Sequence, residues 1–484
     1  MNYKMMGRFH ALILAIESFF MLPALILCFV DGTSKTAVAF AVSIALTAAA
    51  AALLALVSKG AKRDFYVREG LICVGSSWIV ISLFGCLPFW LSGEIPRFID
   101  ALFEMVSGFT TTGSSIVADV EALSRGALYW RSFSHWLGGM GVLVFLLALL
   151  PTGGKNEGFT MHLFRAESPG PDVGKLVPSL KRTARVLYLT YIALTVLNFL
   201  FLLAGGMPVF DAVCTSLGTA GTGGFGIKND SMASYSPYLQ NVTTVFMLLF
   251  GVNFSCYYLL LLGKLKIVFR DEELRMYLGL ILCAVTLIVL NTLHLFDSVG
   301  ETVRHAAFQV AAIITTTGFA TTDFDLWPSF SKTLLLLLMA IGACAGSTGG
   351  GMKCSRGLLL FKNLKRNVAR ILQPNKVQVI RVNGKTVDEQ VVSSTGAYLA
   401  AYVILLIVST LLLSINGFSF ETNFSAALSC MNNIGPGFDA VGPTCNFGLF
   451  SNLSKIVLIL DMLAGRLEIF PILVLLSPRA WRKK

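Results

Sequence analysis

The chain has 484 residues, of which 55% are hydrophobic and 13% are charged, and its mean hydropathy is +0.73. A soluble domain carries about 25% charged residues, so this composition excludes an ordinary water-soluble enzyme or binding domain. The net charge of +11 does not indicate a nucleic-acid partner, because most basic residues lie in alternate connections between apolar segments.

Ten apolar segments are long enough to cross a bilayer, which takes about 20 helical residues. In chain order they cover residues 9–30, 36–58, 70–92, 129–151, 184–204, 239–262, 275–296, 330–351, 395–416 and 453–475. The first is longer than the apolar core of a signal peptide, about 7–15 residues, and no small-residue cleavage site follows it. We therefore interpret it as a membrane helix, and we expect lipid to surround most of the chain.

The basic residues predict the orientation of these crossings. Of the 38 Lys and Arg residues, 29 lie in residues 1–10, 59–68, 152–186, 263–275, 353–385 and 479–484. The positive-inside rule makes that side cytoplasmic, so both termini are expected inside the cell. The ten cysteines and five histidines lack metal-ligand or redox spacing, and the crossings hold no cluster of His, Asp or Cys. We expect neither an enzyme nor an organic cofactor.

Four of the outward connections are too long and too apolar to be simple loops. Each opens with a helical stretch too short to cross, at residues 98–109, 209–220, 302–314 and 421–432. Each then reaches a glycine-bearing turn, and these turns read Thr110-Thr111-Thr112-Gly113, Gly221-Thr222-Gly223-Gly224, Thr315-Thr316-Thr317-Gly318 and Asn432-Asn433-Ile434-Gly435. The pattern of crossing, short helix, turn and crossing therefore occurs four times.

The spacing within the repeats also agrees. Asp100, Asp211 and His305 each precede the glycine of their turn by 13 residues. We predict an all-α polytopic membrane protein with four helix–pore loop–helix units around one pore, plus two extra N-terminal transmembrane helices. The units are residues 1–66 (N-terminal pair), 67–155, 180–265, 270–365 and 395–484 (pore repeats), with a cytoplasmic segment at 366–394 in which residues 377–382 and Gly384 are expected to form a hairpin.

Irregular backbone at membrane depth is tolerated only where protein buries it or water reaches it. Four such turns on one axis can replace the hydration shell of a cation with backbone carbonyls, and the short helices direct partial negative charge toward the same axis. Neither a ring of carboxylates nor any Lys or Arg occupies the turns. The turns therefore predict a pore for a monovalent cation, most simply potassium.

Two further features predict a gate on the inner side of this pore. The eighth crossing ends in a run of glycines from Gly342 to Gly351, which weakens a helix by about 1 kcal/mol per glycine relative to alanine, and Lys353 follows. The run does not match a phosphate-binding loop, because Met352 replaces the lysine. Arg466 lies inside the last crossing, where an arginine normally faces a cavity or a partner. Alternatives for Arg466 are a local pair with Asp461 or Glu468, or snorkelling to the surface.

At these residues the chain resembles the Trk/Ktr/HKT superfamily of potassium transporters, and within it the TrkH-type membrane subunits. The resemblance covers essentially the whole chain and is most specific at residues 107–113, 345–353, 432–437 and 465–468. It implies a potassium filter formed by Thr111, Thr112, Gly113, Thr222, Gly223, Gly224, Thr316, Thr317, Gly318, Asn433, Ile434 and Gly435. It further implies an intramembrane gating loop that includes Gly346, Gly349, Gly350, Gly351 and Lys353, and a pore-blocking arginine at Arg466.

The resemblance also implies a homodimer in the bacterial inner membrane and a cytosolic, nucleotide-binding regulatory partner of the TrkA type. Two turns depart from the family pattern. The second turn has two adjacent glycines, and we choose Gly224 as the filter glycine because Phe225 follows it, as Phe319 follows Gly318. The fourth turn has no threonine. Both departures put strict potassium selectivity in question. The alternative function is an ion-coupled secondary cation transporter, driven by Na⁺ or H⁺, with broken helices near the bilayer midplane.

Overall fold

The computed structural model describes residues 2–60, 67–139, 141, 180–375 and 378–481. The described part of the chain is mostly helical. Within these residues, six helices or helix pairs are long and apolar enough to cross a bilayer, and a seventh is added if a sharply bent pair counts as one span. The second half of the predicted crossing at 129–151 lies outside the described residues, as does most of the connection that follows it.

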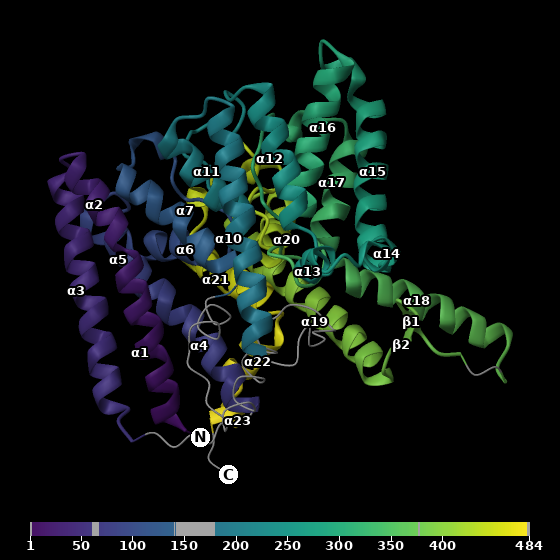
Figure 1. Cartoon of the computed structure of the whole chain (residues 1–484), viewed down its shortest axis with the longest axis horizontal. Helices are drawn as coiled ribbons and strands as arrows, with labels where there is room; N and C mark the ends of the chain where they lie inside the picture. The colour runs from purple at the N-terminus through teal and green to yellow at the C-terminus, as the bar shows by residue number, and fades with distance from the viewer. Residues whose placement is uncertain (1, 61–66, 140, 142–179, 376–377, 482–484) are drawn as a thin grey trace.

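Two N-terminal helical segments form a pair beside the rest of the molecule (Figure 1). The first segment is α1 (Tyr3–Phe20) followed by α2 (Leu22–Val30), and the second is α3 (Ser34–Val57), which packs along α1. Pro23 stands in the first turn of α2, where its missing N–H costs least. This pair corresponds to the two extra N-terminal crossings that the sequence predicts.

Four groups of helices follow in chain order, and each contains one of the half-length helices that the sequence predicts, with a further helix on either side of it. The first comprises α4 (Val67–Gly85), α5 (Leu87–Ser92), α6 (Phe98–Phe109) and α7 (Arg125–Gly139), and the second comprises α10 (Leu180–Ala204), α11 (Val209–Gly221), α12 (Pro237–Phe250), α13 (Phe254–Leu261) and α14 (Leu265–Arg270). The third comprises α15 (Glu272–Thr292), α16 (Val299–Ile314), α17 (Ser329–Ile341) and α18 (Cys354–Leu372). The fourth comprises α19 (Glu389–Leu413), α20 (Phe420–Asn432), α21 (Asn452–Arg466), α22 (Phe470–Leu476) and α23 (Pro478–Trp481).

The short helices α6, α11, α16 and α20 lie where the sequence predicts half-length helices. They contain 12, 13, 16 and 13 residues, so at about 1.5 Å per residue none spans the roughly 30 Å of a hydrocarbon core. Each has an acidic residue in its first turn, at Asp100, Asp211, Glu301 and Glu421. A carboxylate there complements the positive end of the helix dipole. The turns follow the opposite, C-terminal ends of these helices, so all four helices present their negative ends to the turns.

Several predicted crossings are not continuous helices, and three of the breaks matter for the site described below. The segment 239–262 is α12 followed by α13 with a bend of 90°, at a break where the Phe254 N–H donates to the Gly346 carbonyl at 2.9 Å. The segment 453–475 is interrupted between α21 and α22, where Glu468 and Ile469 have φ of 56° and 68°. The segment 330–351 is helical only as far as Ile341, as the glycine run predicts.

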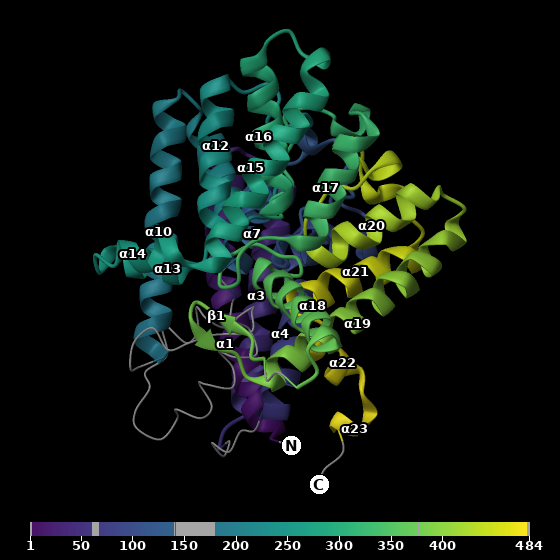
Figure 2. The same ribbon diagram turned by 90° about the vertical axis from the view of Figure 1, so that its right-hand side faces the viewer.

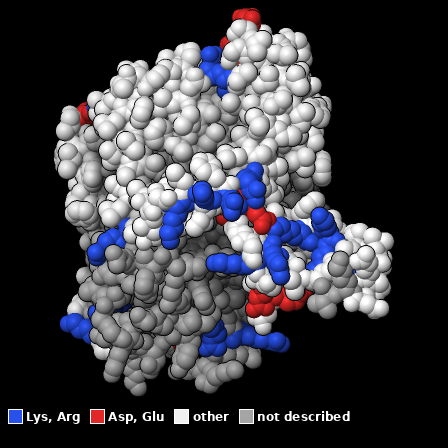
Figure 3. All heavy atoms as spheres, turned by 45° about the vertical axis from the view of Figure 1, so that its right-hand side comes forward, with Lys and Arg blue, Asp and Glu red and all other residues white. Residues whose placement is uncertain are grey.

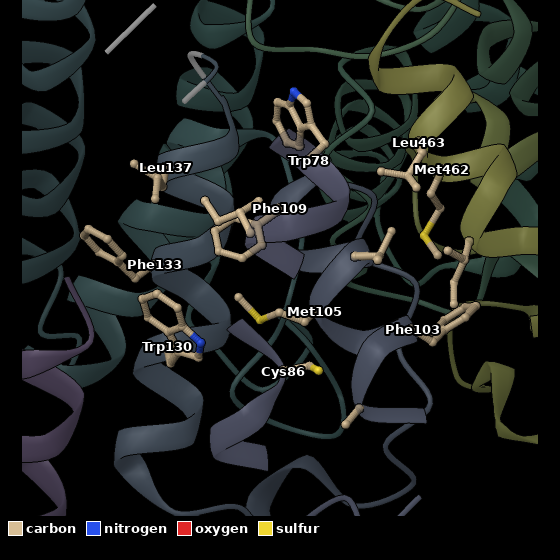
Figure 4. Packing of buried hydrophobic residues seen from close by; sticks show 14 of the residues in the cluster. Trp78, Cys86, Phe103, Met105, Phe109, Trp130, Phe133, Leu137, Met462 and Leu463 are labelled. Atoms are coloured by element: carbon tan, nitrogen blue, oxygen red, sulfur yellow. The ribbon is translucent and has the colours of Figure 1, made fainter. Parts of the chain in front are cut away.

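The largest hydrophobic cluster joins the N-terminal pair to the first and fourth groups. Figure 4 shows part of it, with Trp78, Phe109 and Trp130 packed between α4, α6 and α7, and Met462 and Leu463 contributed by α21. The Trp130 indole N–H donates to the Gly85 carbonyl at 3.0 Å, so this large side chain is buried without an unpaired donor. The cluster fixes the first short helix against the last long one.

A small hairpin follows α18, as the sequence predicts. Strands β1 (Arg381–Val382) and β2 (Lys385–Thr386) pair antiparallel, with Asn383 and Gly384 at φ of 52° and 77° in the turn between them. Figure 1 shows α18 and the hairpin projecting sideways from the lower half of the helical body, and both termini lie at the lower end in Figures 1 and 2. Lys and Arg gather there in Figure 3, whereas the upper half of that face carries few charges.

Candidate functional site

The four predicted turns share one backbone conformation. The residue two before each turn glycine is Thr111, Thr222, Thr316 or Asn433, and its φ lies in the left-handed region at 56°, 53°, 58° or 55°. The glycines themselves, Gly113, Gly224, Gly318 and Gly435, have φ of 80°, 75°, 78° and 108°. Left-handed residues other than glycine are uncommon, so their recurrence at one position in four segments shows that the turns are structural equivalents. The second turn therefore aligns on Gly224.

The turns also touch one another in a closed cycle. A Cβ added to Gly113 would collide with the carbonyl oxygen of Gly223, one on Gly224 with that of Thr317, and one on Gly318 with that of Ile434. A Cβ on Gly435 would lie 3.0 Å from the carbonyl oxygen of Thr112, which returns the cycle to the first turn. Glycine is therefore required because each turn abuts the backbone of the next. We call this arrangement the turn ring.

One cavity lies against the turn ring on the side of the residues that follow the glycines. Its volume is about 120 Å³, room for roughly four waters at about 30 Å³ each. Its lining includes all four turn glycines together with Ser114, Phe225, Ala320 and Pro436, among others. The four turns thus converge on a single space. The negative ends of α6, α11, α16 and α20 end at the same ring.

Hydroxyl and amide side chains stabilise the turns from behind. Thr112 and Thr317 are hydrogen-bonded through their hydroxyls to Thr110 and Thr315, at 2.8 Å in each case. In the fourth turn, the Asn433 amide donates to the Thr112 hydroxyl at 2.9 Å and to the Met462 carbonyl at 2.9 Å. The sequence analysis did not predict this role for Asn433, which ties the fourth turn to the first in the absence of a threonine.

The glycine-rich run from Gly342 to Gly351 lies against the opposite side of the turn ring. The Gly350 N–H donates to the Thr316 hydroxyl at 2.5 Å, and a Cβ on Gly349 would lie 2.9 Å from the Thr315 carbonyl. The run also bonds to the bend between α12 and α13, where Cys344 N–H reaches the Gly251 carbonyl at 3.1 Å. The predicted gating glycines Gly346, Gly349, Gly350 and Gly351 all belong to this segment.

Lys353 ends the glycine-rich run in a left-handed conformation, with φ of 76° and a buried side chain. Its ammonium group donates to the Gly349 carbonyl, so the side chain folds back onto the run. Glu273 of α15, which the sequence analysis missed, connects the run to the start of α18. One of its carboxylate oxygens accepts from Ala345 N–H at 2.6 Å and from Ser355 N–H at 3.0 Å.

Arg466, at the end of α21, contacts three elements at once. Its guanidinium donates to the carbonyls of Gly138 and Gly139 at the end of α7, in the second case at 2.6 Å. It also donates to the Thr348 carbonyl of the glycine-rich run at 3.1 Å and to the Thr111 hydroxyl at 3.3 Å. The hydrogen bonds described for its guanidinium thus reach other segments of the chain, and Glu468 pairs with Arg356. The sequence analysis did not predict the acceptor role of Gly138 and Gly139.

We expect Glu273→Ala to loosen the glycine-rich run. The substitution removes the shared acceptor of two partly buried backbone N–H groups, and the loss of each hydrogen bond costs about 0.5–1.5 kcal/mol. Amide hydrogen exchange of residues 342–356 should therefore accelerate by about tenfold or more. Glu273→Gln retains an acceptor oxygen and serves as the control, with exchange close to that of the parent. Equal exchange in the Ala variant and the parent would show that Glu273 does not hold the run.

Comparisons with known proteins agree with this geometry. A family model described as "TrkH: Cation transport protein" matches residues 36–483. The chain is 37% identical to the Trk system potassium uptake protein TrkH of Salmonella typhimurium and 34% identical to that of Halomonas elongata, in each case over the full length of both chains. The crystal structure of the potassium transporter TrkH from Vibrio parahaemolyticus superposes with a TM-score of 0.87 at 32% identity, covering all of both chains.

Proposed function

Because this chain belongs to the TrkH family of cation transport proteins, we propose that it takes up potassium through a gated, channel-like pathway at the turn ring. The observation that carries the proposal is the closed cycle of contacts among four equivalent turns that line one cavity. Backbone carbonyls in such a ring can replace the water around a potassium ion without any charged ligand. The ion is the transported substrate and is not a resident cofactor.

The proposed potassium ligands are backbone oxygens of the twelve turn residues. These are Thr111, Thr112 and Gly113, Thr222, Gly223 and Gly224, Thr316, Thr317 and Gly318, and Asn433, Ile434 and Gly435. None of the twelve is charged, which favours a monovalent ion over a divalent one. The negative ends of four helices supply the field that attracts a cation to the ring.

The glycine-rich run and two cations form the proposed gate. Gly350 contacts the turn ring directly, and both Lys353 and Arg466 bond to carbonyls of the run. A positive charge below the ring opposes the passage of a potassium ion, and a run rich in glycine can change conformation at low cost. Movement of the run together with Arg466 would open the pathway.

The assembly around this pathway follows from the same family membership. We propose a homodimer in the bacterial inner membrane with both termini cytoplasmic, and a cytosolic TrkA-type regulatory subunit. The basic face that includes α18 and the hairpin supports this orientation, since Lys and Arg are concentrated there. The relatives are named as parts of a Trk system, which supports a multi-component transporter.

Flux into liposomes that contain this chain alone tests the proposal. We expect potassium to enter down its electrochemical gradient at least tenfold faster than sodium, with no dependence on a proton or sodium gradient. A secondary transporter would instead require a gradient of the coupled ion. Growth rescue of a potassium-uptake-deficient cell provides the second measurement. An absence of potassium flux in both experiments would overturn the proposed function.

A further inference from the structure

A buried ion pair lies behind the first two turns, and its arginine, Arg131, also lines the cavity against the turn ring. Glu104 of α6 and Arg131 of α7 are 0% and 2% exposed, and the Arg131 Nε donates to Glu104 at 2.8 Å. A buried ion pair is rarely a strong net stabiliser, because desolvation of the two charges offsets their attraction. Its presence therefore requires another explanation than stability.

The pair reaches the segments that leave both turns. Glu104 accepts from the Ser115 hydroxyl at 2.9 Å and from the Ile116 N–H at 2.9 Å, which fixes the chain just after the first turn. Arg131 donates to the Gly226 carbonyl at 3.3 Å, just after the second turn. One guanidinium and one carboxylate thus join the exits of two adjacent turns, because the planar fork of arginine can hold several acceptors at once.

His135 makes a second connection one helical turn further along α7. Its Nδ1 is 2.8 Å from the Gly108 carbonyl, and its Nε2 accepts from the Phe225 N–H at 3.3 Å. Because Nε2 accepts a hydrogen bond from the Phe225 N–H, it carries no proton of its own. The ring is therefore neutral with its proton on Nδ1, which donates to the Gly108 carbonyl. Residues four apart on a helix share a face, so Arg131 and His135 approach the same two turns.

Phe225 is held between these two side chains. The Arg131 guanidinium lies 4.1 Å from the centre of its ring, and the His135 ring centre lies 4.2 Å away. A Cβ on Gly223 would collide with the His135 ring, so the histidine also rests directly against the second turn. The position of Gly224, which immediately precedes Phe225, is therefore fixed from behind by α7.

The fourth group has no such polar pair at the matching positions. Gly138 and Gly465 are equivalent, because a Cβ on either would collide with a carbonyl at the end of its short helix, that of Phe109 or Met431. Seven and three residues before Gly465 stand Leu458 and Met462, where α7 has Arg131 and His135. The polar connection from α7 to the first and second turns therefore has no counterpart at these positions of α21.

We propose that Glu104, Arg131 and His135 are positioning residues that set the ion selectivity of the turn ring by fixing the second turn relative to the first. This inference rests on the proposed function. Selectivity between potassium and sodium depends on the spacing and stiffness of the coordinating carbonyls. Side chains that hydrogen-bond to the backbone around the second turn fix both properties and so control the selectivity. None of the three is among the twelve proposed potassium ligands.

The test compares Glu104→Gln and His135→Phe with Asp100→Asn. Asp100 lies four residues before Glu104 on the same helix and also belongs to a largely buried ion pair, with Lys455 at 2.6 Å. The hydrogen bonds described for the turns do not involve Asp100, so it serves as the matched control. His135→Phe keeps a buried ring and removes both hydrogen bonds. In liposomes, the ratio of potassium to sodium flux should fall at least tenfold in Glu104→Gln and His135→Phe and stay within twofold of the parent in Asp100→Asn.

A purely structural role predicts less active protein with an unchanged flux ratio, and that result would overturn the inference. If Glu104→Gln does not fold, His135→Phe alone decides, since it keeps the ion pair. Stabilisation of the purified variants by potassium relative to sodium gives a readout without flux, and a difference that persists in His135→Phe would also overturn the inference. A parent protein without potassium flux would refute the proposed function instead.

Discussion

Replacement of Gly318 by serine should abolish selective potassium uptake. The residue has φ of 78°, where a side chain costs about 1–2 kcal/mol, and the new Cβ would collide with the Ile434 carbonyl and lie 2.9 Å from Pro436 Cδ. These neighbours are backbone and a proline ring, so no rotation of a flexible side chain relieves the contact. The fourth turn must move, and with it the carbonyls proposed to hold the ion.

The expected size of the effect follows from the change in coordination. A loss of about 1.4 kcal/mol in the preference for potassium is a tenfold loss in selectivity, and displacement of one turn of four should exceed that. We therefore expect the ratio of potassium to sodium flux to fall at least tenfold in Gly318→Ser. Gly113→Ser should behave alike, because its Cβ would collide with the Gly223 carbonyl.

Gly206→Ser provides the matched control for this prediction. Gly206 has φ of 80°, so a serine there carries the same backbone strain, but no heavy atom lies within 4 Å of the added Cβ. Its flux and selectivity should equal those of the parent once protein amounts are normalised. If Gly318→Ser and Gly206→Ser have the same selectivity, the turn ring is not the pathway.

The sequence predicts the short helices and the turn register well because the fold repeats. The expected helix at 98–109 matches α6 in both bounds, and each of the other three differs from the structure by one to three residues at one end only. The choice of Gly224 over Gly223 agrees with the left-handed backbone of Thr222 and Gly224. Repetition supplies four independent samples of one local pattern, which compensates for the weakness of any single short motif.

Features that depend on contacts between distant segments could not be predicted in the same way. The 90° bend after α12 has no proline and interrupts a continuous apolar stretch, so hydropathy alone favours a straight crossing. Glu273 looks like an ordinary acidic helix start in the sequence, and only the fold brings it to Ala345 and Ser355. Gly138 and Gly139 suggest close helix packing, which the structure confirms, but the sequence does not show that their carbonyls also accept from an arginine more than 300 residues away.

Removal of the positive charge at Arg466 should increase potassium flux. At an effective dielectric constant of about 20, a unit charge some 7 Å from a potassium ion raises its energy by about 2–3 kcal/mol. Even half of this barrier corresponds to a change of about tenfold in rate. We therefore expect Arg466→Met to raise potassium flux into liposomes by about tenfold. The ratio of potassium to sodium flux should stay within twofold of the parent, because the turn ring itself is retained.

Arg466→Lys separates the two ways in which the arginine can close the pathway. Lysine keeps the charge but is a point donor, so it cannot hold Thr348 of the run and the end of α7 together as the guanidinium does. If the barrier is electrostatic, flux in Arg466→Lys stays low. If the hydrogen bonds hold the glycine-rich run against the turn ring, flux rises in Arg466→Lys as it does in Arg466→Met, and hydrogen exchange of residues 342–356 rises with it. Unchanged flux in an intact Arg466→Met protein would remove the residue from the gate, and the run with Lys353 would then have to close the pathway by itself.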